Sequence, residues 1–180
     1  MFLVVVFSST QWVHTPQELS GRTASSVPQE VTSEEQVRRM VDMCIAFVNQ
    51  KGLFTIENPK QSLMFDSHNM IRLYQHTSVF VADLDQCAYG LALPGGPAHT
   101  FCKKSTRIVA NFGDIRTVAR ICPGLSCTHK HEHAIGTRRV IVDGKAVTMS
   151  MAKAAGRYPS SLCHAIAVAV RAALVSQRLM

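Results

Sequence analysis

The chain has 180 residues, of which 47% are hydrophobic and 17% are charged, and its formal net charge is +7. This is the ordinary composition of one globular domain with a buried core. The charge is uneven: residues 1–100 hold 6 basic and 9 acidic side chains, whereas residues 101–157 hold 11 basic and 3 acidic ones. Such asymmetry favours a polyanionic partner, with nucleic acid ahead of a membrane surface, although a solvated basic face explains it equally well.

Six cysteines are spread along the chain without the density or spacing of a disulfide scaffold, which excludes that class and favours a reducing, intracellular setting. The first seven residues, MFLVVVF, lack the basic start and the cleavage pattern of a signal sequence, so we expect a strand there. Residues 161–175 are apolar but shorter than a membrane span, and they carry His164 and Arg171. The sequence therefore predicts no membrane segment.

A polar stretch and a helix follow this first strand. Residues 14–32 are rich in Ser, Thr, Pro and Gln and lack periodicity, which predicts a long loop or lid. Ser33, followed three residues later by Gln36, forms a capping-box pattern. Apolar residues then recur at helical spacing, so an amphipathic helix is predicted over 33–50.

Strands and helices alternate along the rest of the chain. The expected elements are strands at 53–56, 78–85 and 106–112, helices at 61–75 and 114–121, a hairpin turning at Asp143-Gly144, and a final helix from Ser160 to about Gln177. This alternation predicts a single α/β domain over 1–180 with a mostly parallel sheet.

The strand at 53–56 runs directly into Glu57, Asn58 and Pro59. In open parallel sheets, ligands bind outside the carboxyl ends of the strands, so these three residues are the candidates for a catalytic pocket. A glutamate can face a pocket there, an asparagine offers both a donor and an acceptor, and a proline stiffens the loop. The alternative is a turn at Asn58-Pro59, with Glu57 capping the helix that follows.

The segment CPGLSCTHKHEH, residues 122–133, contains two cysteines and three histidines. Zinc takes nitrogen and sulfur ligands in a tetrahedral arrangement, and this pattern supplies four of them. The predicted ligands are Cys122, Cys127, His129 and His131. His133 could replace either histidine, and Cys87 or Cys102 could replace one ligand by folding alongside, because ligands one residue apart are awkward for a single ion. The alternative is a polar surface loop with reduced cysteines.

One tyrosine and several basic residues around this segment are candidates for nucleic-acid contacts. These candidates are Tyr89, Lys103, Lys104, Arg107, Lys130, Arg138 and Arg139. The tyrosine could stack on a base, and the cations could neutralise phosphates. A basic loop pinned by a metal would suit such phosphate contact. The alternative for each group is structural, namely a turn at Tyr89-Gly90 and an exposed basic edge.

The order of these motifs resembles the later half of the DNA cytosine-5 methyltransferase family. The shared features, which span about 50 to 160, are ENP after an apolar strand, then SLMF, then a strand running into DQCAYG, and KKSTRIVANF. They also resemble methyltransferase-like segments of protist mobile-element polyproteins, which end in a Cys/His cluster. The resemblance implies a Rossmann-like fold, S-adenosylmethionine as cofactor and DNA rather than RNA as partner. It gives Glu57 the role of the glutamate that holds a flipped cytosine and helps to protonate it.

The chain departs from the family pattern in two places. Where the family has a catalytic Pro-Cys pair, residues 8–11 read SSTQ, and a serine is a far weaker nucleophile than a thiolate. The glycine-rich cofactor loop has no counterpart, so we expect a fold that is incomplete at its N-terminal side, with a cofactor domain supplied elsewhere. The sequence thus favours a truncated or degenerate methyltransferase-like protein that acts on or binds DNA. The alternatives are a non-catalytic, zinc-stabilised nucleic-acid-binding module and a mobile-element remnant without function.

Overall fold

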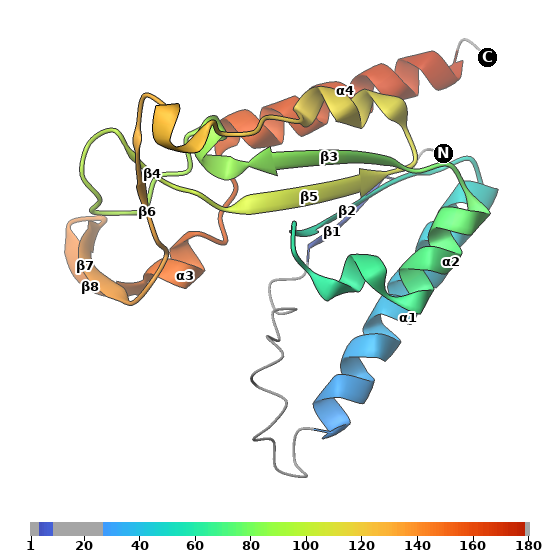
Figure 1. The fold of residues 1–180 in the computed structure, drawn as a ribbon, viewed down its shortest axis with the longest axis horizontal. Helices are drawn as coiled ribbons and strands as arrows, with labels where there is room; N and C mark the ends of the chain where they lie inside the picture. The colour runs from blue at the N-terminus through green and yellow to red at the C-terminus, as the bar shows by residue number, and fades with distance from the viewer. Residues whose placement is uncertain (1–3, 9–26, 179–180) are drawn as a thin grey trace. The chain divides into compact units, whose positions relative to one another are not determined.

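A computed structural model describes the backbone of residues 4–8 and 27–178, and the side chains of residues 34–177. Strands and helices alternate over most of this length (Figure 1). The elements are β1 (Val4–Ser8), α1 (Val27–Asn49), β2 (Leu53–Pro59), η3 (Leu63–Asp66), α2 (His68–His76), β3 (Phe80–Asp85), η4 (Gln86–Tyr89), β4 (Thr100–Cys102), β5 (Ser105–Ala110), η5 (Gly113–Val118), η6 (Gly124–Ser126), β6 (Lys130–Glu132), β7 (Thr137–Val142), β8 (Lys145–Ser150), α3 (Met151–Ala154) and α4 (Ser160–Arg178), where η denotes a 3₁₀ helix.

The largest sheet has four strands in the order β1-β2-β5-β3. Strands β1 and β2 are parallel, with Val4 opposite Leu53 and Ser8 opposite Glu57. Strands β3 and β5 are also parallel neighbours. Two smaller sheets have two strands each: β4 and β6 are parallel, and β7 and β8 are antiparallel. The prediction of an α/β fold is therefore confirmed.

Several predicted elements are confirmed, some with longer bounds. Strand β2 includes Glu57, Asn58 and Pro59, and all of its residues except Pro59 are buried, as expected for a strand covered on both faces. The hairpin turns at Asp143 (φ 50°) and Gly144 (φ 74°), a pair of left-handed residues that fits the twist of the two strands. The final helix begins at Ser160, as predicted.

Other predicted bounds were wrong for local reasons. Helix α1 begins at Val27 and not at residue 33, since Pro28 in its first turn needs no hydrogen-bond partner for its nitrogen. Residues 27–32 of the expected loop are therefore helical, and residues 14–26 lie outside the described part. The helix expected at 61–75 is two pieces, because the Ser67 hydroxyl caps a new helix by accepting from the Met70 N–H. The helix expected at 114–121 is the 3₁₀ helix η5.

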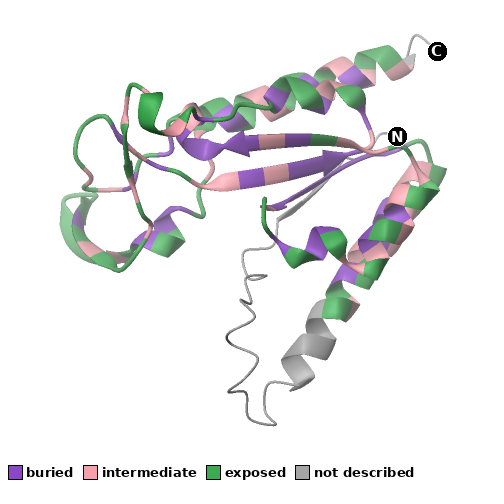
Figure 2. Cartoon of the chain, in the orientation of Figure 1, coloured by how far each residue is buried: buried purple, intermediate pink, exposed green. Residues whose placement is uncertain are grey.

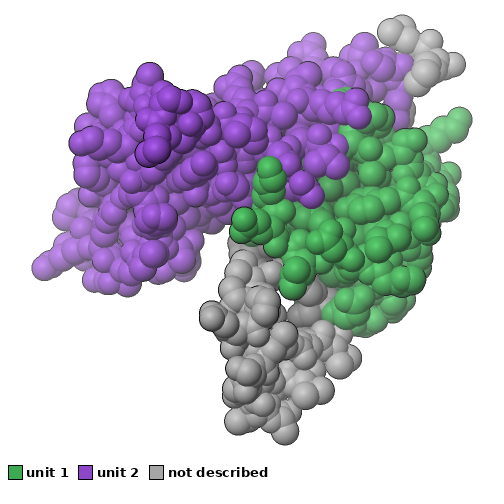
Figure 3. Space-filling model, viewed as in Figure 1, with its two compact units in different colours: residues 1–80, 108–113 green, residues 81–107, 114–180 purple. Residues whose placement is uncertain are grey.

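The chain groups into two compact units, coloured separately in Figure 3. Unit 1 comprises residues 1–80 and 108–113, and unit 2 comprises residues 81–107 and 114–180. Strand β5 contributes residues to both, since its apolar end belongs to unit 1 and its polar start to unit 2.

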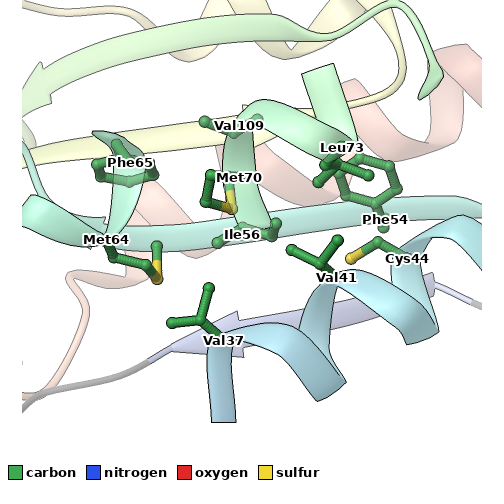
Figure 4. Packing of buried hydrophobic residues seen from close by; sticks show 10 residues of the cluster. All are labelled: Val37, Val41, Cys44, Phe54, Ile56, Met64, Phe65, Met70, Leu73 and Val109. Carbon is green, nitrogen blue, oxygen red and sulfur yellow. The ribbon is translucent and has the colours of Figure 1, made fainter. Parts of the chain in front are cut away.

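Unit 1 has a densely packed apolar core between α1, α2 and β2 (Figure 4). Phe54 and Ile56 of β2 meet Val41 of α1, with fractional exposures of 1% or less. The Asn111 side chain ties the core's edge together, because its Oδ1 accepts from the Phe54 N–H at 2.9 Å and its Nδ2 donates to the Gly52 carbonyl at 2.9 Å. Burial of this apolar surface stabilises unit 1.

Unit 2 contains the two small sheets and α4. A larger share of its described residues is exposed than in unit 1 (Figure 2). One apolar cluster in it consists of Leu91, Leu93, Cys102, Met151, Ala154 and Ala155.

Helix α4 carries an 18-residue window, Ser160–Gln177, that is long and apolar enough by composition to cross a bilayer, and 17% of that window is buried. A single such helix also occurs in proteins without membrane spans. Cys163 of α4 is exposed.

Candidate metal centre

Four side chains of unit 2 converge on one point: Cys87, Cys122, His129 and His131. Their ligand atoms all lie within 4.8 Å of one another. Both cysteines are buried, whereas His129 is half-buried and His131 is exposed. The group therefore has a sulfur side within the protein and an imidazole side toward solvent.

The sulfur side is held in place by Asp85, the last residue of β3. Its backbone N–H donates to the Arg120 carbonyl at 2.8 Å, and its Oδ2 accepts from the Cys122 N–H at 3.0 Å. Asp85 thus holds the segment that leads into Cys122 at two points. Its Oδ1 accepts from the Ser105 hydroxyl, and the Lys103 Nζ lies 3.8 Å from Oδ2, so this buried carboxylate is compensated.

Cys87 lies in the 3₁₀ helix η4, directly after β3. Gln86 fixes this turn on the start of β5, because its N–H donates to the Lys104 carbonyl and its Nε2 donates to the Thr106 hydroxyl, both at 3.0 Å. Gly90 ends η4 in a left-handed conformation (φ 79°), which its N–H stabilises by donating to the Cys87 carbonyl. The position of Cys87 is therefore set by backbone contacts that need no metal.

The imidazole side comes from β6 and the residue before it. Strand β6 pairs with β4, placing His131 opposite Phe101, and the Phe101 ring meets the His129 ring edge-to-face at 5.1 Å between centroids. Phe101 thereby orients the His129 imidazole. The two histidine rings are themselves nearly perpendicular, with an interplanar angle of 83°.

The spacing of Cys122, His129 and His131 is close to that required by a tetrahedral metal ion. With metal–sulfur bonds of about 2.3 Å and metal–nitrogen bonds of about 2.0–2.1 Å, tetrahedral geometry requires about 3.3 Å between two nitrogens and about 3.6 Å between nitrogen and sulfur. The two Nε2 atoms lie 3.0 Å apart, and the Cys122 Sγ lies 3.8 Å from the His129 Nε2 and 3.4 Å from the His131 Nε2. These three side chains could therefore hold one metal ion with small adjustments, and the Cys87 sulfur lies within 4.8 Å of each of their ligand atoms.

Without a metal, the Cys87 thiol and the His131 ring are both uncharged at neutral pH, so the two do not form an ion pair. Burial, and after it the neighbouring Cys122 sulfur and Asp85, raise the pKa of the Cys87 thiol to about 12. The pKa of His131 is lowered, first by burial and then by His129 and Lys103, so its ring stays neutral and keeps a free lone pair at neutral pH. A metal would have to displace the Cys87 proton, which a strong Lewis acid such as zinc does.

Three of the four predicted ligands belong to this group, and one does not. The fourth position is taken by Cys87, named from the sequence only as a substitute, instead of Cys127. The Cys127 thiol donates to the His129 carbonyl at 3.0 Å and lies 3.8 Å from the His131 Nε2, so it lies beside the group. Cys102 belongs to the apolar cluster, and His133 is exposed.

The residues proposed for a base pocket lie in unit 1. Glu57 is 5% exposed and Asn58 is fully buried at the end of β2, where the Asn58 Nδ2 contacts the Met64 Sδ at 3.1 Å. Pro59 is half-buried. The N-cap of the 3₁₀ helix that follows is Ser62, whose hydroxyl accepts from the Met64 N–H.

The proposed phosphate-binding residues all belong to unit 2, but several have acidic partners. Arg107 makes two hydrogen bonds to Asp83, at 2.8 and 3.0 Å, and Arg138 pairs with Glu132. Lys103 lies 3.8 Å from Asp85, and the Lys104 ammonium lies 5.5 Å from the centroid of the Tyr158 ring. Lys130 and Arg139 are exposed.

Tyr89 is not placed for stacking on a base. It is 5% exposed, its hydroxyl donates to the Val118 carbonyl at 2.7 Å, and the Arg120 guanidinium lies 4.7 Å from its ring centroid. It is a buried contact of unit 2, in keeping with the turn that ends at Gly90.

Sequence reasoning overlooked Asp85 and ranked Cys87 too low. The pattern Asp-x-Cys at the end of a predicted strand was the available signal, since residues at strand ends gather at one edge of a parallel sheet.

Comparison of the chain with protein-family models, with curated proteins and with solved structures gave no match.

Proposed function

We propose that this protein is a nucleic-acid-binding module whose basic unit is stabilised by a structural zinc ion. The observation that carries the proposal is the convergence of Cys87, Cys122, His129 and His131 inside the unit that holds the protein's positive charge.

Two sulfurs and two imidazole nitrogens are the donor set of structural zinc sites, which are closed, tetrahedral and four-coordinate. Magnesium and calcium prefer oxygen ligands and are disfavoured here. The local architecture needs such a crosslink: β4 and β6 have three residues each, and an isolated two-stranded sheet is marginally stable in water. A zinc ion would join the η4 turn, the Cys122 segment and β6.

The charge of unit 2 favours a polyanion. It contains thirteen Lys and Arg residues against five Asp and Glu, a net of +8, whereas unit 1 has six against seven, a net of −1. Three of the acidic residues, Asp83, Asp85 and Glu132, lie beside a basic side chain, which leaves a large excess of positive charge on this unit. Phosphate neutralisation with counterion release gives such a surface affinity for nucleic acid.

Metal content tests the first part of this proposal. Protein purified without added metal is expected to contain about one zinc per chain by elemental analysis, because a closed sulfur-nitrogen site retains zinc through purification. Cys122→Ser should lose that zinc, whereas Cys163→Ser, at an exposed cysteine outside the group, should retain it. Zinc-free wild-type protein that also fails to take up zinc from solution would remove the metal from the proposal.

Binding to a labelled 20-base-pair duplex, followed by fluorescence anisotropy over a range of salt concentrations, tests the second part. The logarithm of the affinity should fall linearly with the logarithm of salt concentration, because each phosphate contact releases a counterion. Absence of binding at low salt by zinc-loaded protein would contradict the nucleic-acid proposal while leaving the metal site intact.

A second candidate function rests on the buried polar end of β2. Glu57 and Asn58 are buried, and β1 ends beside them, with Ser8 opposite Glu57 in the parallel register. This is where a Rossmann-like methyltransferase fold would receive a flipped base, consistent with the resemblance to the DNA cytosine-5 family. S-adenosylmethionine would supply the methyl group, and Glu57 would hold the base. Calorimetric titration with S-adenosylmethionine and a methyl-transfer assay comparing wild type with Glu57→Gln test it; no heat and no transfer would remove the enzyme.

A further inference from the structure

The β7–β8 hairpin is a two-stranded ribbon with one face free of other contacts. In an antiparallel pair, residues directly opposite one another lie on the same face. The register places Arg139 opposite Thr148 and Ile141 opposite Ala146 on one such face. All four are exposed, and so are Thr137 and Ser150 at the end of the same row (Figure 2).

The opposite face anchors the ribbon within unit 2. Val140 is 7% exposed and packs so close to Gly95 that a Cβ there would meet its Cγ1 at 3.3 Å. On the same face, Arg138 pairs with Glu132 of β6. The Met151 N–H donates to the Gly136 carbonyl at 3.0 Å and closes the base of the hairpin. The ribbon is therefore fixed along part of one face, on which Val142, Lys145 and Val147 are exposed, and it presents the whole of the other face to solvent.

The exposed face has the chemistry of a surface that reads base edges. Its residues are one arginine, three hydroxyl side chains, one alanine and one isoleucine: Arg139, Thr137, Thr148, Ser150, Ala146 and Ile141. Arginine binds guanine through O6 and N7, hydroxyls bind any base edge, and small apolar groups contact the thymine methyl. No acidic residue lies on this face, and the hairpin's single acid, Asp143, is in the turn.

A hollow of about 570 Å³ lies along β8 and is lined by β8, α3 and the residues after it. Two cations, Lys153 and Arg157, line this hollow, and none of its lining residues is acidic. Both are exposed. A concave cationic surface beside a ribbon is suited to a backbone phosphate, the contact that fixes the register of a protein on DNA.

We propose that the β7–β8 ribbon enters the major groove of duplex DNA with Arg139 toward the base edges, while Lys153 and Arg157 bind the adjoining backbone phosphate. The major groove, about 12 Å wide, admits a two-stranded ribbon and presents the guanine O6 and N7 that an arginine binds, whereas the minor groove is only about 6 Å wide and presents neither atom. DNA is the proposed partner because of charge complementarity. The hollow lined by Lys153 and Arg157 belongs to the unit with a net charge of +8, and the DNA backbone is negatively charged. This inference rests on the proposed nucleic-acid function. It specifies which structural element binds the DNA and which groove that element enters.

The phosphate contacts are tested with the double variant Lys153→Gln/Arg157→Gln in the zinc-loaded full chain. Loss of two phosphate contacts should lower the magnitude of the salt slope by about 1.8 and weaken duplex binding at least tenfold. The matched control is Arg171→Gln, which removes an exposed charge from α4 of the same unit and should change binding by less than threefold. Equal effects of the two variants, with zinc content and circular dichroism unchanged, would overturn the proposal.

The groove is tested by dimethyl sulfate footprinting on a random-sequence duplex. Protection of guanine N7, which lies in the major groove, is expected, and Arg139→Gln should lose it together with a tenfold preference for guanine-containing sites. Protection of adenine N3 instead would place the ribbon in the minor groove and overturn the proposal. Equal affinity for single strands and duplex would also overturn it but leave nucleic-acid binding standing, whereas no binding of any nucleic acid would remove both.

Discussion

Each of the two units of the chain is stabilised internally by a different set of interactions. Unit 1 buries a cluster of ten mostly aliphatic and aromatic residues around β2, with Phe54 and Val41 fully buried. Unit 2 also buries apolar residues, among them Leu84, Ile115 and Leu162, and one described cluster of six in it has three that are alanine or cysteine. In unit 2 buried hydrogen bonds, such as those of Asp85 and Gln86, and a donor set for one metal ion add to this apolar burial.

This difference has a functional counterpart. A region crosslinked by a metal can leave many of its side chains exposed, because metal binding adds to the stability that its buried apolar residues supply. In unit 2 the β7–β8 ribbon is almost entirely exposed, and the positive charge is concentrated there. Unit 1 is close to neutral in charge and carries the buried Glu57. The contrast therefore predicts that a change in the core of unit 1 lowers stability without altering metal binding. A change at the metal group should affect unit 2 alone.

The largest expected effect is in unit 1. Phe54→Ala removes a fully buried ring from the core and should lower the free energy of unfolding by about 3–5 kcal/mol, through lost burial and the cavity left behind. Chemical denaturation followed by circular dichroism measures this loss.

The control for that variant is Ile71→Ala on α2, which removes an aliphatic side chain that is 45% exposed and should cost less than about 1 kcal/mol. Zinc content should be the same in both variants, since neither residue belongs to unit 2. A loss of zinc in Phe54→Ala would show that the metal group depends on the apolar core, and the contrast would fail.

Removal of the metal should act on unit 2 alone. Zinc present at 100 times its dissociation constant contributes about 2.7 kcal/mol to the stability of the folded state. After chelation, amide hydrogen exchange should therefore speed up about 100-fold for residues 120–132 and remain unchanged for residues 53–56. Equal acceleration in both segments would mean that the two units unfold together.

Metal affinity should depend on pH in a defined direction. Burial raises the pKa of the Cys87 thiol from 9.0 to about 12, so zinc must displace a proton to bind it, and protons compete more strongly as pH falls. Lowering the pH from 7.5 to 6.5 should weaken zinc binding by about 10- to 100-fold, measured by competition with a chelator. In the metal-free chain the sign is reversed, since a raised thiol pKa stabilises the fold below pH 9 and this contribution is lost as pH rises further. Affinity that is constant with pH would exclude thiolate ligands.

Most of the regular elements could be predicted from the sequence, because their patterns are local. The apolar run at β2 and the Asp143-Gly144 turn carry the information for a strand and a hairpin within a few residues. The pairing of β4 with β6 was not predictable in this way. Each has three residues, too few for a periodic pattern, and they pair across about 30 residues of chain.

The metal group shows the same limit. The sequence supplied Cys122, His129 and His131 because they lie within one short segment, and it favoured Cys127 for the same reason. The fourth group, Cys87, comes from a turn 35 residues earlier, which is brought there by Asp85 and by the backbone contacts of Gln86. Such a contribution is fixed by tertiary structure, so the spacing within residues 122–133 could not reveal it, and the Asp-x-Cys pattern at a strand end was its signal in the sequence.

The smallest predicted effect tests how much of the metal group is organised by hydrogen bonds. Asp85→Asn keeps one oxygen to accept from the Cys122 N–H and places an amide beside the Ser105 hydroxyl, which can rotate to accept from it. Two effects oppose each other. Loss of the negative charge would make the Cys87 thiol easier to deprotonate, whereas the weaker amide acceptor would hold the Cys122 segment less firmly.

We expect the positioning effect to dominate, because Asp85 comes after burial and the Cys122 sulfur among the causes that raise the Cys87 pKa. Zinc affinity should fall about tenfold, equivalent to about 1.4 kcal/mol and at the lower end of the range for residues that orient metal ligands. Asp83→Asn is the matched control: it removes the same charge two residues earlier, where the carboxylate pairs with Arg107 and not with Cys122, and it should leave zinc affinity unchanged. Tighter zinc binding by Asp85→Asn would show that the carboxylate acts on the centre chiefly through its charge, and that Cys122 is positioned by the metal itself.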